Sequence, residues 1–355
     1  MSAAGKAASA TDGDVAVEFN KVNIVFGDQP GKALPLMDKG MSRSEIQKAT
    51  GQILGVHDCS LTVARGEILV LMGLSGSGKS TLLRAVNGLN PVCRGSVTVH
   101  DGDWSCEVGG ANREDLLKVR RECVAMVFQQ FGLLPWRSVR ENVGLGLELA
   151  GQTPAQMREK VDEQLALVGL SERADAKVGE LSGGMQQRVG LARAFVTDAP
   201  ILLMDEPFSA LDPLIRTRLQ DELLELQAKL HRTIIFVSHD LDEAFKIGNR
   251  IALMEGGRIV QCGTAREIIA NPVSDYVADF VNHMNPLSVL TARDAVEPTP
   301  NSTPTDGQCD IDTPIKDVMA RLKDETRALE VTDRGKVVGQ VSRKTVIARL
   351  LDPRG

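Results

Sequence analysis

The chain has 355 residues, and its 41 basic and 47 acidic side chains give a formal net charge of -6. A mildly acidic chain lacks the basic face with which nucleic-acid binders neutralise phosphates, so we expect no nucleic-acid partner. Aromatic residues make up only 3% of the chain, which excludes a base-stacking platform and predicts an aliphatic core.

The N-terminal part predicts a disordered start, a strand and an insertion. Residues 1–14 are rich in Ala, Ser and Gly, and we expect them to be disordered. Apolar side chains recur from Val15 to Phe26 and predict a strand pair or an edge hairpin. Residues 27–54 break this pattern and indicate an insertion, in which Ser42 and Glu45 predict a capped helix over residues 41–49.

From Gly55 onward, predicted strands alternate with predicted helices. Continuous apolar strands, of the kind that a parallel sheet covers on both faces, are predicted over residues 67–72, 124–128, 200–204 and 233–237. Helices are predicted between them, for example over residues 158–168 and 214–230. This alternation indicates the α/β fold class.

The composition changes after Asn285. A run of Pro, Ser and Thr over residues 297–306 predicts a linker, which we place at residues 286–310. Residues 311–355 are expected to form a small C-terminal module. Its predicted elements are a helix over 315–322, a strand pair over 328–331 and 336–341 with a turn at 333–335, and a helix over 345–351.

A glycine-rich motif follows the predicted strand that ends at Met72. It fits the pattern G-x-x-x-x-G-K-[ST], and a helix is expected to begin near Lys79. Glycines let several backbone N–H groups approach one phosphate, and the helix N-terminus adds positive partial charge. The candidate nucleotide-binding residues are Gly73, Ser75, Gly76, Ser77, Gly78, Lys79, Ser80 and Thr81. In this motif Lys79 would contact the β- and γ-phosphates and Ser80 would ligate Mg2+, which predicts a nucleoside triphosphate as ligand.

Two adjacent acids, Asp205 and Glu206, end the apolar run that begins at Ile201. A strand buried on both faces does not end in two carboxylates without cause. We expect Asp205 to hold Mg2+ through water and Glu206 to activate the attacking water as a general base. An ordinary solvated strand exit is the alternative when these acids are considered alone, and the phosphate loop argues against it.

Four further motifs resemble those of the ABC-type ATPases and occur in the order that is typical of that family. Leu181 to Arg188 is similar to the family signature, and Ser209 to Asp212 is similar to the D-loop. Gln129 follows a predicted strand as the Q-loop glutamine does, and His239 ends another strand as the switch histidine does. The resemblance covers most of residues 15–265.

This resemblance implies a P-loop NTPase of the ABC type. We therefore expect an ATPase domain over residues 15–285 with a RecA-like core, an antiparallel β subdomain and a helical signature subdomain at about 130–195. The implied activity is ATP hydrolysis with ATP and Mg2+ as ligands. A non-transport ABC ATPase is a further alternative, but the chain has one cassette and no long coiled coil. A non-catalytic nucleotide sensor is disfavoured by Glu206.

The resemblance also assigns roles to individual residues. The residues Ser182, Gly183 and Gly184 would contact the γ-phosphate bound by a second copy, and Asp212 would join the ATP-binding set, so that a homodimer encloses two ATP molecules. His239 would hold Glu206 and the water in line. Gln129 would sense the metal as one of its ligands and couple the site to a transporter. Phe26 occupies the position of the adenine-stacking aromatic, which is usually Tyr.

Segments outside these motifs resemble one branch of the family. The insertion at 27–54 is similar to one in the ATPase subunits of quaternary-amine importers for glycine betaine, proline and choline. Residues 128–137 and 278–287 most resemble the choline importer ATPase of proteobacteria. Residues 311–355 resemble the later half of one CBS module, for which we favour a structural role.

This branch implies an ATPase that energises import of choline, or alternatively of glycine betaine, proline or another amino-acid-type substrate. The implied partners are integral membrane permease subunits and, indirectly, a periplasmic substrate-binding protein. The apolar residues Phe131, Leu133, Leu134 and Trp136 would help to form the groove for a permease helix. The expected location is the cytoplasmic face of the bacterial inner membrane, as a peripheral subunit, because no apolar run approaches the ~20 residues of a spanning helix.

Overall fold

The computed structural model describes residues 15–130, 132–282, 285–298, 305, 307–323 and 327–351. The predicted disordered start, residues 1–14, lies outside these ranges, as does Phe131. The chain divides into two compact units. One comprises the residues up to His239 together with Ala252–Ile259, and the other comprises Asp240–Ile251 together with the residues from Val260 onward.

The first unit contains an antiparallel sheet with the strand order β2-β1-β4-β5. Its strands are β1 (Val15–Phe26), β2 (Ile53–Ala64), β4 (Arg94–Asp101) and β5 (Trp104–Glu107). The apolar run from Val15 is one strand that pairs with β2 on one side and β4 on the other. It is therefore an interior strand, and the predicted hairpin within it does not form.

A second sheet has the order β10-β9-β3-β8-β7-β6. Its strands are β3 (Ile68–Met72), β6 (Val124–Val127), β7 (Ile201–Asp205), β8 (Thr233–Val237), β9 (Arg250–Glu255) and β10 (Arg258–Gly263). The strands β3, β8, β7 and β6 pair in parallel and match the four predicted apolar runs. Because parallel strands end at the same edge, the loops that follow them meet there.

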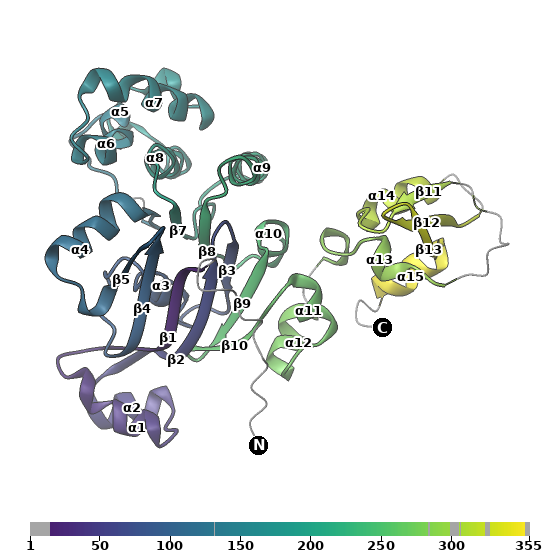
Figure 1. Cartoon of the computed structure of the whole chain (residues 1–355), viewed down its shortest axis with the longest axis horizontal. Helices are drawn as coiled ribbons and strands as arrows, with labels where there is room; N and C mark the ends of the chain where they lie inside the picture. The colour runs from purple at the N-terminus through teal and green to yellow at the C-terminus, as the bar shows by residue number, and fades with distance from the viewer. Residues whose placement is uncertain are drawn as a thin grey trace. The chain divides into compact units, whose positions relative to one another are not determined.

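Four helices of the first unit form one group (Figure 1). They are α5 (Val139–Val143), α6 (Leu145–Leu149), α7 (Pro154–Leu167) and α8 (Gly183–Phe195). The predicted helix at 158–168 is the later part of α7. This helix begins earlier because Thr153 and Gln156 form a capping box and Pro154 occupies the first turn, where a missing N–H costs nothing.

The first unit also contains helices outside this group. They are α3 (Lys79–Leu83), α4 (Arg113–Lys118) with a π-helical turn at Val119–Cys123, α9 (Pro213–Leu230), and short 3-10 helices at Pro30–Lys32, Val108–Gly110, Ser171–Arg173 and Val178–Glu180. The helix predicted at 214–230 is confirmed as α9.

The insertion at 27–54 forms two short helices, α1 (Leu34–Asp38) and α2 (Arg43–Thr50). The predicted capping box is confirmed: the Ser42 side chain accepts the Glu45 N–H, and the Glu45 carboxylate accepts the Ser42 N–H at 2.8 Å. Met37 and Ile46 bury their side chains against apolar residues of β1 and β2. The insertion is therefore a small packed layer.

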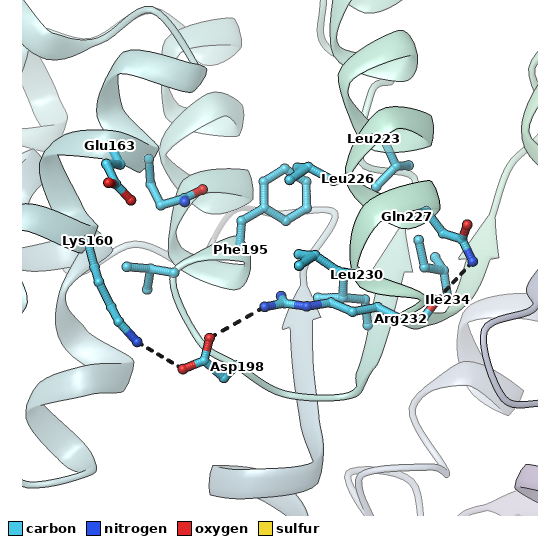
Figure 2. Close-up of a pocket in the computed structure, with 13 residues that line it drawn as sticks. Lys160, Glu163, Phe195, Asp198, Leu223, Leu226, Gln227, Leu230, Arg232 and Ile234 are labelled. Atoms are coloured by element: carbon cyan, nitrogen blue, oxygen red, sulfur yellow. Dashed lines mark hydrogen bonds and ion pairs between the residues drawn. The ribbon is translucent and has the colours of Figure 1, made fainter.

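A cavity of about 190 Å³ lies where α7, the end of α8 and α9 meet. Figure 2 shows Lys160 and Arg232 pointing toward Asp198 from two sides, next to the apolar side chains of Phe195 and Leu230. The Asp198 carboxylate lies 2.9 Å from Lys160 Nζ and 3.8 Å from Arg232 Nη2. Its side chain is 80% exposed, so each ion pair stabilises this junction by at most about 1 kcal/mol.

The second unit contains a small sheet with the order β11-β12-β13. Its elements are α10 (Leu241–Ile247), α11 (Ala265–Ala270), α12 (Asp275–Asn282), a 3-10 helix (Pro286–Ser288), α13 (Ala292–Ala295), β11 (Gln308–Asp310), α14 (Ile315–Leu322), β12 (Leu329–Asp333), β13 (Lys336–Val341) and α15 (Arg343–Leu351). The predicted turn is confirmed, with Arg334 and Gly335 both at positive φ between antiparallel β12 and β13.

The linker predicted at 286–310 is wrong in extent. Leu290, Ala292 and Ala295 are buried in the core of the C-terminal module, together with Cys309. The Ala292 N–H donates to Thr313 O at 2.8 Å, which ties this segment to the module. The Pro-rich run that follows dominates the composition of this region, so composition alone does not indicate the few apolar positions before it. Most of that run lies outside the described residues.

Stability of the C-terminal module should depend on Ile315, which is fully buried at the start of α14. Ile315→Ala should lower the free energy of unfolding of the module by about 2–5 kcal/mol, because it leaves a cavity. Met319→Ala changes a 39% exposed side chain of the same helix and should cost less than about 0.5 kcal/mol. Hydrogen exchange of the β12 and β13 amides in urea measures the free energy of unfolding of both variants. Equal losses in the two variants would contradict the placement of Ile315 in the core of the module.

Candidate nucleotide site

The loop from Gly73 to Gly78 joins β3 to α3 in a conformation that requires glycine. Gly73, Gly76 and Gly78 have φ values of +139°, +77° and +103°. A Cβ atom on Gly73 would collide with the carbonyl oxygen of Met254, and one on Gly78 would lie 2.7 Å from the carbonyl oxygen of Gly55. The backbone carbonyls of Met254 and Gly55 therefore pack closely against the predicted phosphate loop.

The Lys79 side chain lies within this loop. Only 6% of it is exposed, and Nζ donates to Gly73 O at 2.9 Å and to Leu74 O at 3.1 Å. Burial lowers the pKa of the Lys79 ammonium, while the nearby carboxylates of Glu206 and Asp205 oppose that shift. An ammonium has three N–H donors, so one remains for an anion in the loop.

Ser80 and Asp205 contact each other across the first turn of α3 and the end of β7. Ser80 Oγ donates to Asp205 Oδ1 at 2.6 Å, and Arg84 Nη2 donates to Asp205 Oδ2 at 2.8 Å. Asp205 is completely buried. Hydroxyl and carboxylate oxygens are the ligand atoms that Mg2+ prefers. Phosphate oxygens of a bound nucleotide would complete the coordination shell of the ion. The residues present therefore fit this ion.

Glu206 has an unusual backbone, with φ at +49°. Its N–H donates to Val237 O at 3.2 Å, which holds the residue beside the end of β8. Gln129 Nε2 donates to Glu206 Oε2 at 3.3 Å, and His239 Nδ1 lies 3.4 Å from the same oxygen. Side chains that follow β6, β7 and β8 thus converge on one carboxylate, as parallel strands predict.

The predicted residues surround one cavity of about 400 Å³. Its lining consists of Ser75, Gly76, Gly78, Lys79, Ser80, Thr81, Gln129, Glu206 and His239. Asp205 lies behind Ser80. The structure therefore brings the phosphate loop, the candidate metal-binding pair of Ser80 and Asp205, and the candidate base Glu206 to one place.

The signature and D-loop residues lie outside this cavity. Ser182 caps the N-terminus of α8 through the Met185 N–H, and Ser182 and Gly183 are exposed while Gly184 is half-buried. Asp212 caps α9 by accepting the Ile215 N–H at 3.1 Å and is exposed. In a single chain, none of them lines the cavity that holds Lys79.

Phe26 ends β1 beside the phosphate loop and is 37% exposed. A Cβ atom on Gly55 would lie 2.8 Å from Phe26 Cε2 and 3.1 Å from Thr81 Cγ2. The ring therefore lies against Gly55 at the edge of the loop, and Phe26 does not line the cavity itself.

Two residues that contact the site were not predicted. Gln187, which is 1% exposed, donates from Nε2 to Glu206 O at 3.2 Å and accepts the Ala210 N–H at 3.1 Å. Arg84 binds Asp205 as described above. Gln187 belongs to the signature motif, but the motif does not indicate which side chain faces Glu206.

Comparisons with known proteins identify the family. The family model described as ABC transporter matches residues 56–209. The chain is similar to the glycine betaine/proline betaine transport system ATP-binding protein ProV of Escherichia coli (strain K12), with 45% identity over 347 residues, which cover 96% of this chain and 84% of that protein. It is also similar to the trimethylamine N-oxide transport system ATP-binding protein TmoW of Ruegeria pomeroyi, with 42% identity over 341 residues, or 96% of this chain and 98% of that protein.

A solved structure supports the fold. The dimeric structure of MJ0796, a bacterial ABC transporter cassette, has a TM-score of 0.60 and 28% identity, and the match covers 70% of this chain and 98% of that chain. None of the helices in the described part of the chain is long and apolar enough to cross a membrane. From its fold, its nucleotide cavity and the extent of these similarities, the chain belongs to the ATP-hydrolysing subunits of ABC importers in the glycine betaine, proline and osmoprotectant family.

Proposed function

We propose that this chain hydrolyses ATP to drive import of choline, or of a related quaternary amine such as glycine betaine, through a membrane permease. The observation that carries the ATPase part is the convergence of Lys79, Glu206 and His239 on one cavity. In this proposal Lys79 and the N–H groups of the phosphate loop hold the β- and γ-phosphates. Phe26 stacks on the adenine.

Ser80 and Asp205 would hold Mg2+ together with Gln129, and the ion would neutralise charge on the phosphate oxygens. Glu206 accepts a proton from the attacking water as a general base. Gln129 and His239 both approach Glu206 Oε2, so they restrict the direction in which this carboxylate points. His239 also contacts the γ-phosphate in this scheme.

Glu206→Gln should slow ATP hydrolysis by at least about 100-fold, because general bases typically contribute factors of 10² to 10⁴. ATP binding should persist, so ATP-bound dimers should accumulate and be visible by size-exclusion chromatography. Glu225→Gln, on an exposed site of α9, is the matched control and should retain the parental rate. Parental hydrolysis by the Glu206 variant would remove Glu206 as the base.

The exposed signature residues support a homodimer that encloses two ATP molecules. Ser182, Gly183 and Gly184 lie at a helix N-terminus, where N–H groups attract anions, yet they do not line the cavity of their own chain. We propose that they meet the γ-phosphate held by a second copy, beside Asp212. Loss of that phosphate removes the bridging charge, so the copies separate.

Ser182→Arg should reduce ATP hydrolysis at least about 10-fold while leaving the affinity for ADP unchanged, because a bulky cation would block the second copy's approach and not the chain's own cavity. Ser171→Arg adds the same charge at another exposed serine of this unit and is the control. Steady-state hydrolysis and titration with a fluorescent ADP analogue measure the two effects. Full turnover by a monomeric Ser182 variant would contradict the shared site.

A larger cavity in the helical group is the proposed permease contact. It has a volume of about 1040 Å³ and is lined in part by Trp136, Met157 and Val161. Trp136 is 69% exposed, whereas Leu133 and Leu134 are half-buried. We place a permease helix in this groove, with its apolar side chains against Trp136. Such docking would hold the subunit at the cytoplasmic face of the inner membrane.

The choice of choline rests on lineage, because no residue of this chain is assigned to contact the cargo. Residues 128–137 and 278–287 resemble the choline importer ATPase, while named relatives serve glycine betaine and trimethylamine N-oxide. All three compounds carry a trimethylated nitrogen. In this scheme a periplasmic binding protein and the permease select the cargo. The CBS-like module, which contains β11–β13, is proposed as a structural attachment.

Deleting the gene for this chain should abolish uptake of radiolabelled choline at micromolar concentrations, because the permease loses its energy source. Uptake should return with the parental gene and not with the Glu206→Gln variant. Loss of glycine betaine uptake with intact choline uptake would assign the chain to betaine transport. Unchanged uptake of both would contradict a role in quaternary-amine import.

A further inference from the structure

Arg43 connects the insertion to the phosphate loop. It is the first residue of α2, whose start is fixed by the Ser42–Glu45 capping box and whose position is fixed by fully buried Ile46. From this anchored helix, Arg43 Nη1 donates to Gly76 O at 2.7 Å. Arg43 Nη2 donates to Gly55 O. The guanidinium thus bridges two backbone segments.

A third segment closes around the same guanidinium. A Cβ atom on Gly257 would lie 2.6 Å from Arg43 Nη2, so the turn between β9 and β10 packs directly on it. The Gly257 N–H donates to Ser77 O at 3.1 Å. Arg43 and Gly257 therefore hold neighbouring carbonyls of the phosphate loop.

When the N–H groups of a phosphate loop are directed at an anion, a donor bound to one of its carbonyls fixes the orientation of that peptide unit. The Lys79 ammonium binds the carbonyls of Gly73 and Leu74. The space beside the Gly76 Cα is open, since a Cβ placed on it would meet nothing within 4 Å. Its φ is +77°, a conformation with few steric restraints for glycine. The hydrogen bond from Arg43 therefore restrains the Gly76 carbonyl, while the Ser77 N–H bond to Leu74 O and the Gly257 N–H bond to Ser77 O hold the residues around it.

The cost of placing Arg43 here argues against an incidental surface contact. Its Nε atom is buried and has no hydrogen-bond partner among the described residues. Burial also lowers the pKa of the guanidinium. An arginine without a structural task would keep its charged group in water and bury only its stem.

We infer that Arg43 is a positioning residue for ATP binding: from outside the nucleotide cavity, it holds the Gly76 carbonyl and thereby keeps the phosphate loop in its binding shape. Its positive charge also adds to the potential that attracts the phosphates. The inference rests on nucleotide binding at the cavity and is independent of the proposed dimer, permease and cargo.

Nucleotide binding and the stability of α2 are thermodynamically linked through Arg43. If Arg43 couples α2 to the loop, a nucleotide that orders the loop must also stabilise α2, by the same free energy with which α2 favours the nucleotide. Amide hydrogens of α2 should therefore exchange more slowly when MgADP is bound. If Arg43 only stabilised the insertion, it would affect the exchange rate of the α2 amides by the same factor with and without nucleotide.

The test compares three variants of the full chain. Arg43→Met keeps the apolar stem and removes both donors, Arg43→Lys keeps the charge, and Lys48→Met removes one charge from an exposed site of the same helix as the control. We expect Arg43→Met to weaken binding of a fluorescent ADP analogue with Mg2+ about 10-fold, as loss of a charged hydrogen bond to a backbone group predicts. Its kcat at saturating ATP should change less than about 2-fold, since Arg43 touches no reacting atom.

Arg43→Lys should recover part of the lost affinity, and Lys48→Met should match the parent. The nucleotide-dependent protection of α2 should disappear in Arg43→Met alone. Equal ADP affinity in Arg43→Met and Lys48→Met, or protection of α2 that survives in Arg43→Met, would overturn the proposal. Thermal unfolding without nucleotide identifies a variant that fails to fold, and Arg43→Lys then carries the same comparison with Lys48→Met.

Discussion

A buried ammonium group surrounded by carbonyl oxygens is the constraint on which the first unit depends. Lys79 donates to Gly73 O and Leu74 O, and a charge removed from water in this way needs compensating partners. The loop curves closely enough to supply them only because its glycines have no side chains to collide with the carbonyls of Met254 and Gly55. The phosphate loop therefore fixes how closely strands of both sheets approach it.

The parallel order of the second sheet supplies the remaining chemistry. Because β6, β7 and β8 run in the same direction, Gln129, Glu206 and His239 leave the sheet at one edge. Glu206 turns toward that edge through a left-handed backbone, which is unfavourable for a residue with a Cβ. Two hydrogen bonds stabilise this conformation: the Glu206 N–H donates to Val237 O, and Gln187 Nε2 donates to Glu206 O.

The features that the sequence predicted are local or periodic. The four apolar strands, the phosphate loop, the capping box of α2 and the turn at Arg334 each depend on residues a few positions apart. The missed features join distant segments: Arg43 reaches Gly76, and Gln187 reaches Glu206. No periodicity specifies which polar side chain will face a remote carbonyl. The linker boundary failed for a related reason, since Leu290 and Ala292 gain their burial from strands and helices further along the chain.

Helix α8 connects the exposed signature residues to the hydrogen bonds of Gln187. Ser182 caps its exposed start, and Gln187, about one and a half turns later, contacts both Glu206 O and the Ala210 N–H. A hydrogen-bonded helix transmits displacement over so short a distance with little loss, because its turns cannot compress independently. Gln187 therefore links α8 to both the backbone of Glu206 and the loop before α9. The exposed start of α8 and the Glu206 carboxylate in the cavity are thus joined by one continuous series of contacts, although Ser182 does not line the cavity of its own chain.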